Sequence, residues 1–322
     1  MTALSKTLPA LALLGSLLSA GPACAQALKA TVSQAFQSML YLPLYVAMDE
    51  GLFAKAGIAV TKETAGAPSV ALSAVISKSA EFSIHGPEWT AVAASKGAPV
   101  NVIANVVNGA AVWIATTPDF NFTGVKDLKG QTIVTGLMPT TSTSLFLKLL
   151  KENGLSKDDV TLTQVQLGTE PGPFLAGQAK VAVLYEPGLD QVVAKGMKVV
   201  LGFPKLYGPY AFSAVSARKD VDPAAAQAFV NGMQAAVTLM QAEPAKAVAV
   251  AKRQFPNLDP AVVEAAVKRM MDEKVYPVSV DITKAALALG LDTQIALGNL
   301  AAQPDYDTFV RKDFIAKALA AN

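Results

Sequence analysis

The 322-residue sequence has very few of the side chains that most metal and catalytic sites use. It contains one histidine, His85, and one cysteine, Cys24, and this scarcity excludes most zinc sites, iron–sulfur clusters and internal disulfides. A Ser-His-Asp hydrolase would have to use His85, because there is no other histidine. We therefore expect no metal, no cofactor and no catalytic residue.

Charge is also scarce, since charged residues make up 16% of the chain and the net charge is +2. Neither sign is clustered, so the sequence has no basic stripe for nucleic acid. A hydrophobic content of 52% excludes a disordered chain. The sequence also lacks a phosphate loop, a dinucleotide fingerprint and a G-x-S-x-G nucleophile elbow. These absences favour a protein that binds rather than one that catalyses.

The N-terminus has the pattern of a secretory signal peptide over residues 1–25. Lys6 supplies a positive charge, residues 8–18 are apolar, and Ala23-Cys24-Ala25 offers a small-x-small cleavage site. We expect cleavage after Ala25 and a periplasmic product. Lipid anchoring at Cys24 is disfavoured, because Gly21 stands where a lipobox has an aliphatic residue. No later apolar run reaches the ~20 residues that a spanning helix needs.

Short β-rich runs alternate with helical stretches over residues 28–216, which predicts βαβ units and two mostly parallel sheets. The expected strands cover residues 29–33, 58–61, 82–84, 100–107, 111–116, 131–135, 160–165, 181–184 and 198–201. The expected helices cover residues 42–54, 68–78, 87–95, 142–153, 172–178 and 187–195. After about residue 217 the pattern changes to alanine-rich helices, two of which begin at Asp222-Pro223 and Asp259-Pro260.

Three segments together resemble one known family. Residues 41–60 read YLPLYVAMDEGLFAKAGIAV, residues 127–130 read DLKG, and FLAG at 174–177 leads into VAVLYEP at 181–187. This combination is similar to the nitrate/sulfonate/taurine group of periplasmic substrate-binding proteins of ABC transporters. That group also contains binders of thiamine-pyrimidine precursors. The resemblance covers roughly residues 30–215.

The resemblance implies a type II periplasmic-binding-protein fold, in which two α/β lobes close on a ligand about a two-strand hinge. We expect lobe one at 26–111 plus 217–322 and lobe two at 112–216, with crossings near 112–117 and 210–216. It also implies a small-molecule ligand, a membrane permease as partner and a monomeric state. The family usually has Gly-x-Asp where this chain has Ser79-Ala80-Glu81. Its pyrimidine-precursor synthases carry a cysteine-rich motif that is missing here.

Ligands of such sheets bind outside the carboxyl ends of the strands, so the loops there give the candidate site. In lobe one these residues are Gln34, Phe36, Ser38, Tyr41, Gly66, His85, Glu88 and Trp89. In lobe two they are Thr140, Thr141, Ser142, Tyr185, Glu186 and, near the return crossing, Tyr210. Several have a structural alternative: helix capping at 140–144, core hydrogen bonding for His85, a solvated rim position for Glu88, and core packing for Phe36 and Tyr41.

The ligand class follows from what these loops contain. All four arginines come after the second crossing and none lies on an expected cleft loop, which argues against an arginine clamp on an anion. Aromatic rings and carboxylates favour an aromatic or nitrogen-heterocyclic ligand that stacks on Trp89 and donates to Glu186. The alternative is a small sulfonate or carboxylate at the N-terminus of the helix at 140–144. A sensor module and a pyrimidine-precursor synthase remain as other function classes.

Overall fold

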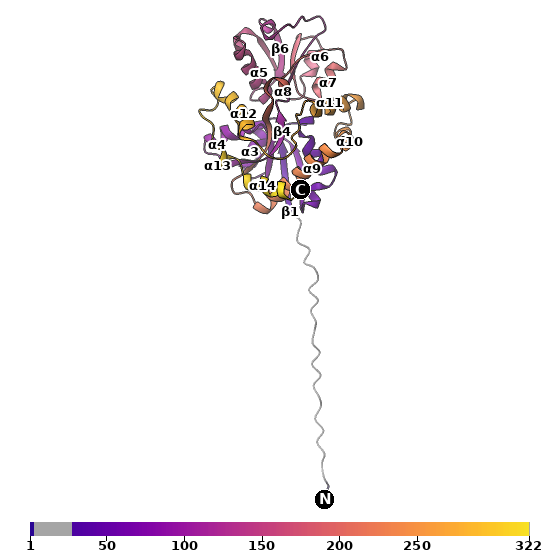
Figure 1. The fold of residues 1–322 in the computed structure, drawn as a ribbon, viewed down its shortest axis with the longest axis vertical. Coiled ribbons are helices and arrows are strands. Elements are labelled where there is room, and N and C mark those ends of the chain that lie inside the picture. Colours follow the sequence, from indigo (N-terminus) through magenta and orange to yellow (C-terminus); the bar gives the residue numbers. More distant parts are fainter. Residues whose placement is uncertain (3–27, 322) are drawn as a thin grey trace.

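The structure is a computed structural model that describes residues 1–2 and 28–321. The expected signal peptide, its cleavage site after Ala25 and the lipidation candidate Cys24 lie outside the described residues. The chain forms two halves stacked along the long axis of the molecule (Figure 1). Each half contains one five-stranded sheet.

The first sheet has the strand order β2-β1-β3-β10-β4. Its strands are β1 (Leu28–Gln34), β2 (Ile58–Thr64), β3 (Phe82–His85), β4 (Val100–Gly109) and β10 (Pro209–Arg218). The 3-10 helix η1 (Met39–Tyr41) and the helices α1 (Leu42–Asp49), α2 (Leu52–Lys55), α3 (Pro68–Ile76) and α4 (Pro87–Ser95) connect them. The β1 strand is parallel to β2 and β3, whereas β10 is antiparallel to both of its neighbours.

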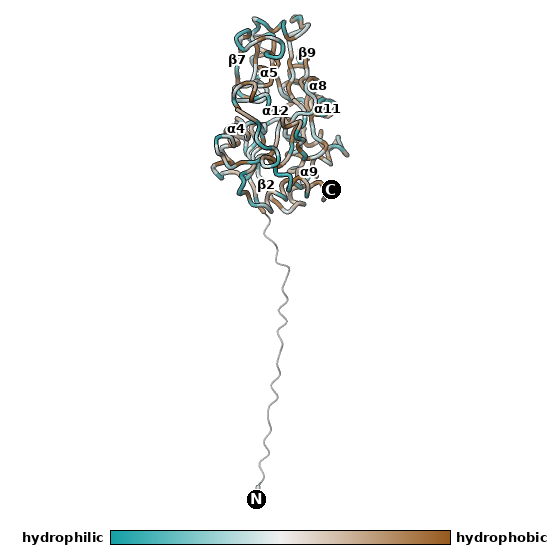
Figure 2. The backbone as a smooth tube through the Cα atoms, turned by 60° about the vertical axis from the view of Figure 1, so that its left-hand side comes forward, coloured by the Kyte–Doolittle hydropathy of each residue, from teal (hydrophilic) through white to brown (hydrophobic). Residues whose placement is uncertain are grey.

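The second sheet has the order β7-β6-β8-β5-β9, with β5 as its reversed strand. Its strands are β5 (Trp113–Thr116), β6 (Thr132–Gly136), β7 (Thr161–Val165), β8 (Val181–Leu184) and β9 (Lys198–Gly202). Its helices are η2 (Val125–Leu128), α5 (Thr141–Glu152), η3 (Lys157–Asp159), α6 (Pro171–Leu175), α7 (Gly188–Val193) and α8 (Phe203–Tyr207). Figure 2 shows β7 and β9 on opposite sides of this half, as the strand order requires.

Two local expectations differ from the structure. The single helix expected at 42–54 is divided into α1 and α2 by Gly51, whose φ of +66° is a left-handed conformation that a regular α-helix cannot contain. The second difference is the return to the first sheet. Because β10 begins at Pro209 and pairs with β3 and β4, residues 210–216 belong to the first sheet rather than the second.

The C-terminal helices cover the first sheet and also reach the second half. They are α9 (Pro223–Ala242), α10 (Pro244–Gln254), α11 (Pro260–Asp272), α12 (Lys284–Ala296), α13 (Tyr306–Phe309) and α14 (Lys312–Ala320). Asp222 and Asp259 cap α9 and α11, as their positions before proline predict. The α12 helix packs on β10, α4 and α5, and α11 packs on α10 and α7. These two helices lie at the waist of the molecule and connect the halves (Figure 1).

Candidate functional site

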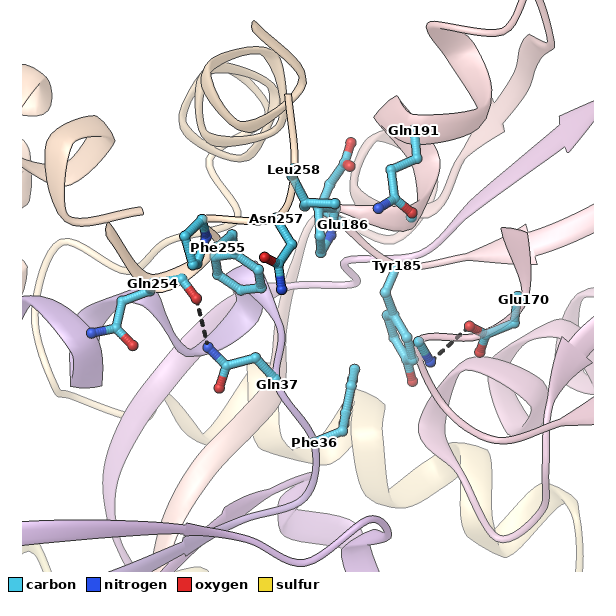
Figure 3. A pocket seen from close by; sticks show the side chains of 14 residues that line it. Phe36, Gln37, Glu170, Tyr185, Glu186, Gln191, Gln254, Phe255, Asn257 and Leu258 are labelled. Carbon is cyan, nitrogen blue, oxygen red and sulfur yellow. Dashed lines mark hydrogen bonds between the residues drawn. The ribbon is translucent and has the colours of Figure 1, made fainter. Parts of the chain in front are cut away.

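A cavity of about 290 Å³, here called the cleft pocket, lies where loops of the two halves meet (Figure 3). The loop after β1 contributes Phe36 and Gln37, and the loop after β8 contributes Tyr185 and Glu186. The segment 254–258 between α10 and α11 forms a further wall. The pocket therefore lies at the carboxyl ends of strands from both sheets, as expected for this kind of fold.

A buried carboxylate joins the halves at residues that are not part of the pocket lining. The Glu88 side chain is fully buried, and its Oε1 accepts a hydrogen bond from Thr141 Oγ1 at 2.5 Å. Glu88 belongs to α4 of the first half, whereas Thr141 begins α5 of the second. Burial raises the pKa of Glu88 to about 7, against a smaller opposing contribution from the Thr141 hydrogen bond.

Three polar atoms at this junction are buried and have no hydrogen-bond partner. They are Glu88 Oε2, Trp89 Nε1 and Ser142 Oγ, and we call Glu88, Trp89, Thr141 and Ser142 the inner cluster. An unsatisfied buried polar group costs about 1–3 kcal/mol, and a charged group costs more. The cluster thus contains hydrogen-bonding capacity that the chain itself does not use.

The hydroxyl of Tyr185 covers the first turn of α5. It accepts a hydrogen bond from the Ser142 backbone N–H at 2.8 Å and lies 3.3 Å from Thr140 Oγ1. Thr140 is the N-cap residue of α5, but its side chain makes no capping hydrogen bond. Burial raises the pKa of Tyr185, so the hydroxyl stays neutral over the ordinary pH range. One of the free backbone N–H groups at the N-terminus of α5 is therefore already bonded to a side chain of the protein.

Aromatic rings form a continuous set between the two halves. Phe36 lies 5.3 Å from Tyr185 and 5.7 Å from Tyr41, measured between ring centroids. Phe212 of β10 lies 5.9 Å from both Tyr185 and Tyr210. Of these rings, Phe36 and Tyr185 line the cleft pocket, whereas Tyr41 and Tyr210 are almost fully buried behind them.

Glu186 lies at the pocket but its carboxylate is already engaged. Its Oε1 accepts from Arg269 Nε at 2.9 Å and its Oε2 from the Asp190 N–H at 3.0 Å. Arg269 Nη2 also pairs with Asp190 at 2.6 Å. Burial and then Asp190 raise the pKa of Glu186, while Arg269 opposes them. Arg269 belongs to α11 and not to an expected cleft loop, and it does not line the pocket, but it reaches the Glu186 carboxylate from behind the pocket wall. Both oxygens of Glu186 therefore already have a partner within the chain.

Ser38 adds a second link between the halves at the same place. Its Oγ donates to the Glu186 carbonyl oxygen at 2.8 Å and accepts from the Leu40 N–H, so it also caps η1. Gly66 faces the second half as well, since a Cβ built on it would lie 3.8 Å from Gln166 Nε2. Its φ of +88° explains why glycine suits this turn.

Gln34 and His85 are both held by hydrogen bonds within the first half. Gln34 Nε2 donates to Gln37 Oε1 at 2.7 Å. His85 is fully buried between the Ser83 hydroxyl and the Gly86 carbonyl oxygen, at 3.0 and 2.9 Å from its ring nitrogens. Burial lowers the pKa of His85 to about 4, so its ring is neutral near pH 7. This arrangement fits the core role that the sequence left open for His85.

Sequence reasoning missed most of the residues that line the cleft pocket, and five of these are Gln37, Glu170, Gln191, Phe255 and Asn257. Three of them follow rules the sequence could have offered: Gln37 is next to Phe36, Glu170 follows β7, and Gln191 follows β8 by one turn of α7. Phe255 and Asn257 come from a helix–helix loop that the strand-end rule does not cover. Glu170 is 2% exposed, and burial raises its pKa to about 7.

Comparison with known proteins agrees with this architecture. Residues 39–247, more than half of the chain, match the NMT1/THI5-like family. The chain belongs to this family. Among curated proteins it is 23% identical over 258 residues to YtlA of Bacillus subtilis (strain 168), which is named as a binding protein, and the match covers 77% of each chain.

Solved structures give the fold class. The periplasmic aliphatic sulphonate-binding protein SsuA of Escherichia coli has a TM-score of 0.73 and 16% identity, covering 90% of this chain and 99% of that one. The desulfurization enzyme DszB has a TM-score of 0.68 and 14% identity, covering 91% and 99%. The fold is that of type II periplasmic binding proteins, as the sequence predicted. The enzyme neighbour shows that this fold alone does not decide between binding and catalysis.

Within residues 1–2 and 28–321, no helix is long and apolar enough to cross a membrane. The same residues contain no group of three or more His, Cys, Asp or Glu side chains placed to hold a metal ion.

Proposed function

We propose that this protein is the periplasmic solute-binding component of an ABC importer. It captures a small solute between its two halves and delivers it to a membrane permease. Membership of the NMT1/THI5-like family and likeness to a periplasmic sulphonate-binding protein support this role. The two sheets act as the two lobes, and the short connections at residues 110–112 and at Gly208 act as hinges.

The observation that carries the proposal is the unused hydrogen-bonding capacity of the inner cluster. Glu88 Oε2 and Trp89 Nε1 come from the first half and Ser142 Oγ from the second, and all three are buried without partners. A ligand that reaches these atoms contacts both halves at once. Such a ligand stabilises the closed form over the open one, because those contacts exist together only when the halves meet.

The same cluster favours an aromatic or nitrogen-heterocyclic solute with a hydrogen-bond donor or cationic edge. Glu88 rather than Glu186 is the acceptor, because Glu186 is already paired with Arg269 and the Asp190 N–H. The rings of Phe36 and Tyr185 offer flat apolar surface in the cleft pocket. The solute is thus bound by stacking and by donation to a buried carboxylate.

The alternative ligand, a small sulfonate or carboxylate at residues 140–144, fits less well. The first turn of α5 already receives the Glu88 carboxylate at Thr141 and the Tyr185 hydroxyl at the Ser142 N–H. An anion there would have to displace both groups and would lie against the negative charge of Glu88. The relative that is named for sulphonate therefore differs from this chain in the solute we propose.

A catalytic function, such as pyrimidine-precursor synthesis, has less support. The single histidine is fully buried, with its two ring nitrogens bonded to Ser83 and Gly86. The enzyme neighbour DszB shares 14% identity with this chain. We expect no turnover of any solute that the protein binds, and detection of covalently bound pyridoxal phosphate would contradict this expectation.

Native mass spectrometry of the purified protein, followed by a thermal-shift screen of metabolites, tests the function. A true solute at about 100 times its Kd should add ~2.7 kcal/mol to the free energy of unfolding. Small-angle scattering should then show a smaller radius of gyration with saturating solute. If no heterocycle, amine, sulfonate or carboxylate shifts the transition, the binding function is wrong. An unchanged radius with proven binding would refute hinge closure.

A further inference from the structure

Apart from Glu170 and Tyr185, the polar side chains of the cleft pocket fall into two groups. Gln37, Gln254 and Glu186 are occupied by other protein groups. Gln37 Oε1 accepts from Tyr45 and Lys62, and Gln254 bonds to Asp49 and Lys62. These side chains support the pocket wall and have little capacity left for a solute.

Gln191 and Asn257 are different, because neither side-chain amide makes a hydrogen bond within the described residues. Gln191 lies on α7 of the second half, and Asn257 lies on the loop after α10. That loop is tied to the first half, since the Gln254 carbonyl oxygen accepts from Gln37 at 3.4 Å. Figure 3 shows the two amides on either side of Glu186 at the rim of the pocket.

The pocket also has a definite charge. No lysine, arginine or histidine lines it, and its carboxylates are Glu170 and Glu186. Glu186 is neutralised by Arg269, whereas no ion pair within the described residues reaches Glu170. An anionic group would therefore meet no cation in the pocket and would pay its desolvation cost without compensation.

Each free amide presents one acceptor and two donors on a planar group. Two such amides from opposite halves match a planar partner that has a donor beside an acceptor, such as a carboxamide, a urea or a lactam. Phe36, Tyr185 and Phe255 provide aromatic wall surface for a flat group of this kind.

We propose that Gln191 and Asn257 form an amide clamp that binds an uncharged carboxamide-like group of the solute at the mouth of the cleft. The inference rests on the proposed solute-binding function and adds a specificity element distinct from Glu88. Because the clamp takes one amide from each half, it acts only when the halves are closed. It selects against solutes whose outer end is anionic.

Isothermal titration with three probes of similar size tests the clamp: benzamide, benzoate and the benzylammonium ion. We expect benzamide to bind at least about tenfold more tightly than benzoate, a difference of ~1.4 kcal/mol. Gln191→Ala and Asn257→Ala should each weaken benzamide binding about fivefold, the loss expected for a neutral hydrogen bond. Gln178→Ala, an exposed glutamine outside the pocket lining, is the matched control and should change nothing.

Asn257→Asp provides a second measurement that does not depend on loss of binding. It replaces the amide by a carboxylate of the same shape, so the preference should shift from benzamide toward benzylammonium. The clamp is wrong if none of the three probes binds, if both alanine variants bind benzamide as the wild type does, or if Asn257→Asp leaves the preference unchanged. A screened solute that still closes the protein in these cases would leave the transport function standing and overturn only the clamp.

Discussion

Glu186 and Glu88 are two buried carboxylates in the region where the halves meet, and their surroundings differ. Glu186 has both oxygens occupied, by Arg269 and the Asp190 N–H, and its carbonyl oxygen accepts from Ser38. Glu88 has one oxygen bonded to Thr141 and the other without any partner. Both side chains are fully buried.

This difference separates a structural carboxylate from one available to a ligand. A buried charge that is paired and hydrogen-bonded fixes the geometry of its elements, and here it ties α11 to the β8–α7 loop. A buried charge that lacks a partner is costly to the empty protein and gains most when a donor arrives. We therefore expect Glu186 variants to change stability and Glu88 variants to change binding.

The largest expected effect is on the Glu186 side. Arg269→Met leaves Glu186 and Asp190 without their counter-ion, and should lower the free energy of unfolding by about 3 kcal/mol. Urea denaturation of the wild type and of Arg269→Met measures this difference in the free energy of unfolding. Arg311→Met is the control, because its pair with Asp313 is more exposed and should contribute less than about 1 kcal/mol. Equal losses in the two variants would contradict the structural role of Arg269.

The next effect concerns pH and the Glu88 side. Burial raises the pKa of Glu88 in the folded chain to about 7, above its unfolded value of roughly 4.3. The folded state thus holds this proton more tightly, so the free energy of unfolding falls as the pH rises from about 4.3 and levels off above about 7. Glu88→Gln removes this loss and should gain about 2 kcal/mol relative to the wild type between pH ~5 and ~8.

The comparison must be made between the two proteins, because other groups titrate in the same window. Burial raises the pKa of Glu170 to about 7, so Glu170 also makes the free energy of unfolding fall as the pH rises. Burial lowers the pKa of His85 to about 4, whereas histidine in the unfolded chain has a pKa of roughly 6.5. His85 therefore makes the free energy of unfolding rise with pH between these two values. Both cancel when urea denaturation of ligand-free wild type and Glu88→Gln is compared at each pH. Parallel pH curves would show that Glu88 is not the buried group described here.

Binding gives a smaller effect that separates the two carboxylates directly. With the solute that the screen identifies, Glu88→Gln should weaken binding at least tenfold, or roughly 1.4 kcal/mol, because a charged acceptor is lost. Glu186→Gln should lower stability more than affinity, since its oxygens face Arg269 and Asp190. Isothermal titration and urea denaturation of both variants give the four numbers required. If Glu186→Gln binds the solute weakly while Glu88→Gln binds it as tightly as the wild type, then Glu186 is the hydrogen-bond acceptor for the solute.

The sequence was sufficient to predict most of the framework. The alternation of short β-rich runs with helices predicts both sheets. The strand-end rule places Phe36 and Tyr185 at the cleft, and both line the cleft pocket. It works because the carboxyl ends of parallel strands meet at one edge of a sheet. Local pattern and local geometry agree at these positions.

The sequence could not predict that the Glu186 carboxylate is already paired. The partner of Glu186 is Arg269, which arrives on a helix from the other end of the chain, and no local pattern links the two. Asn257 is hidden for the same reason, because its loop reaches the cleft only through the packing of α10 and α11. Long-range packing determines these contacts, so only the three-dimensional structure gives them.

The smallest expected effect tests whether the Glu186 side also contributes to closure. Ser38→Ala removes the hydrogen bond from Ser38 Oγ to the Glu186 carbonyl oxygen, one of the links between the halves. A neutral hydrogen bond contributes about 1 kcal/mol, so the closed form should lose that much and solute affinity should fall about fivefold. Ser73→Ala on α3 is the control, because its hydroxyl bonds only within its own helix. If scattering shows the same degree of closure and titration the same Kd for both variants, the Ser38 hydrogen bond does not contribute to closure, which then depends on the other links between the halves, Arg269 with Glu186 and Thr141 with Glu88.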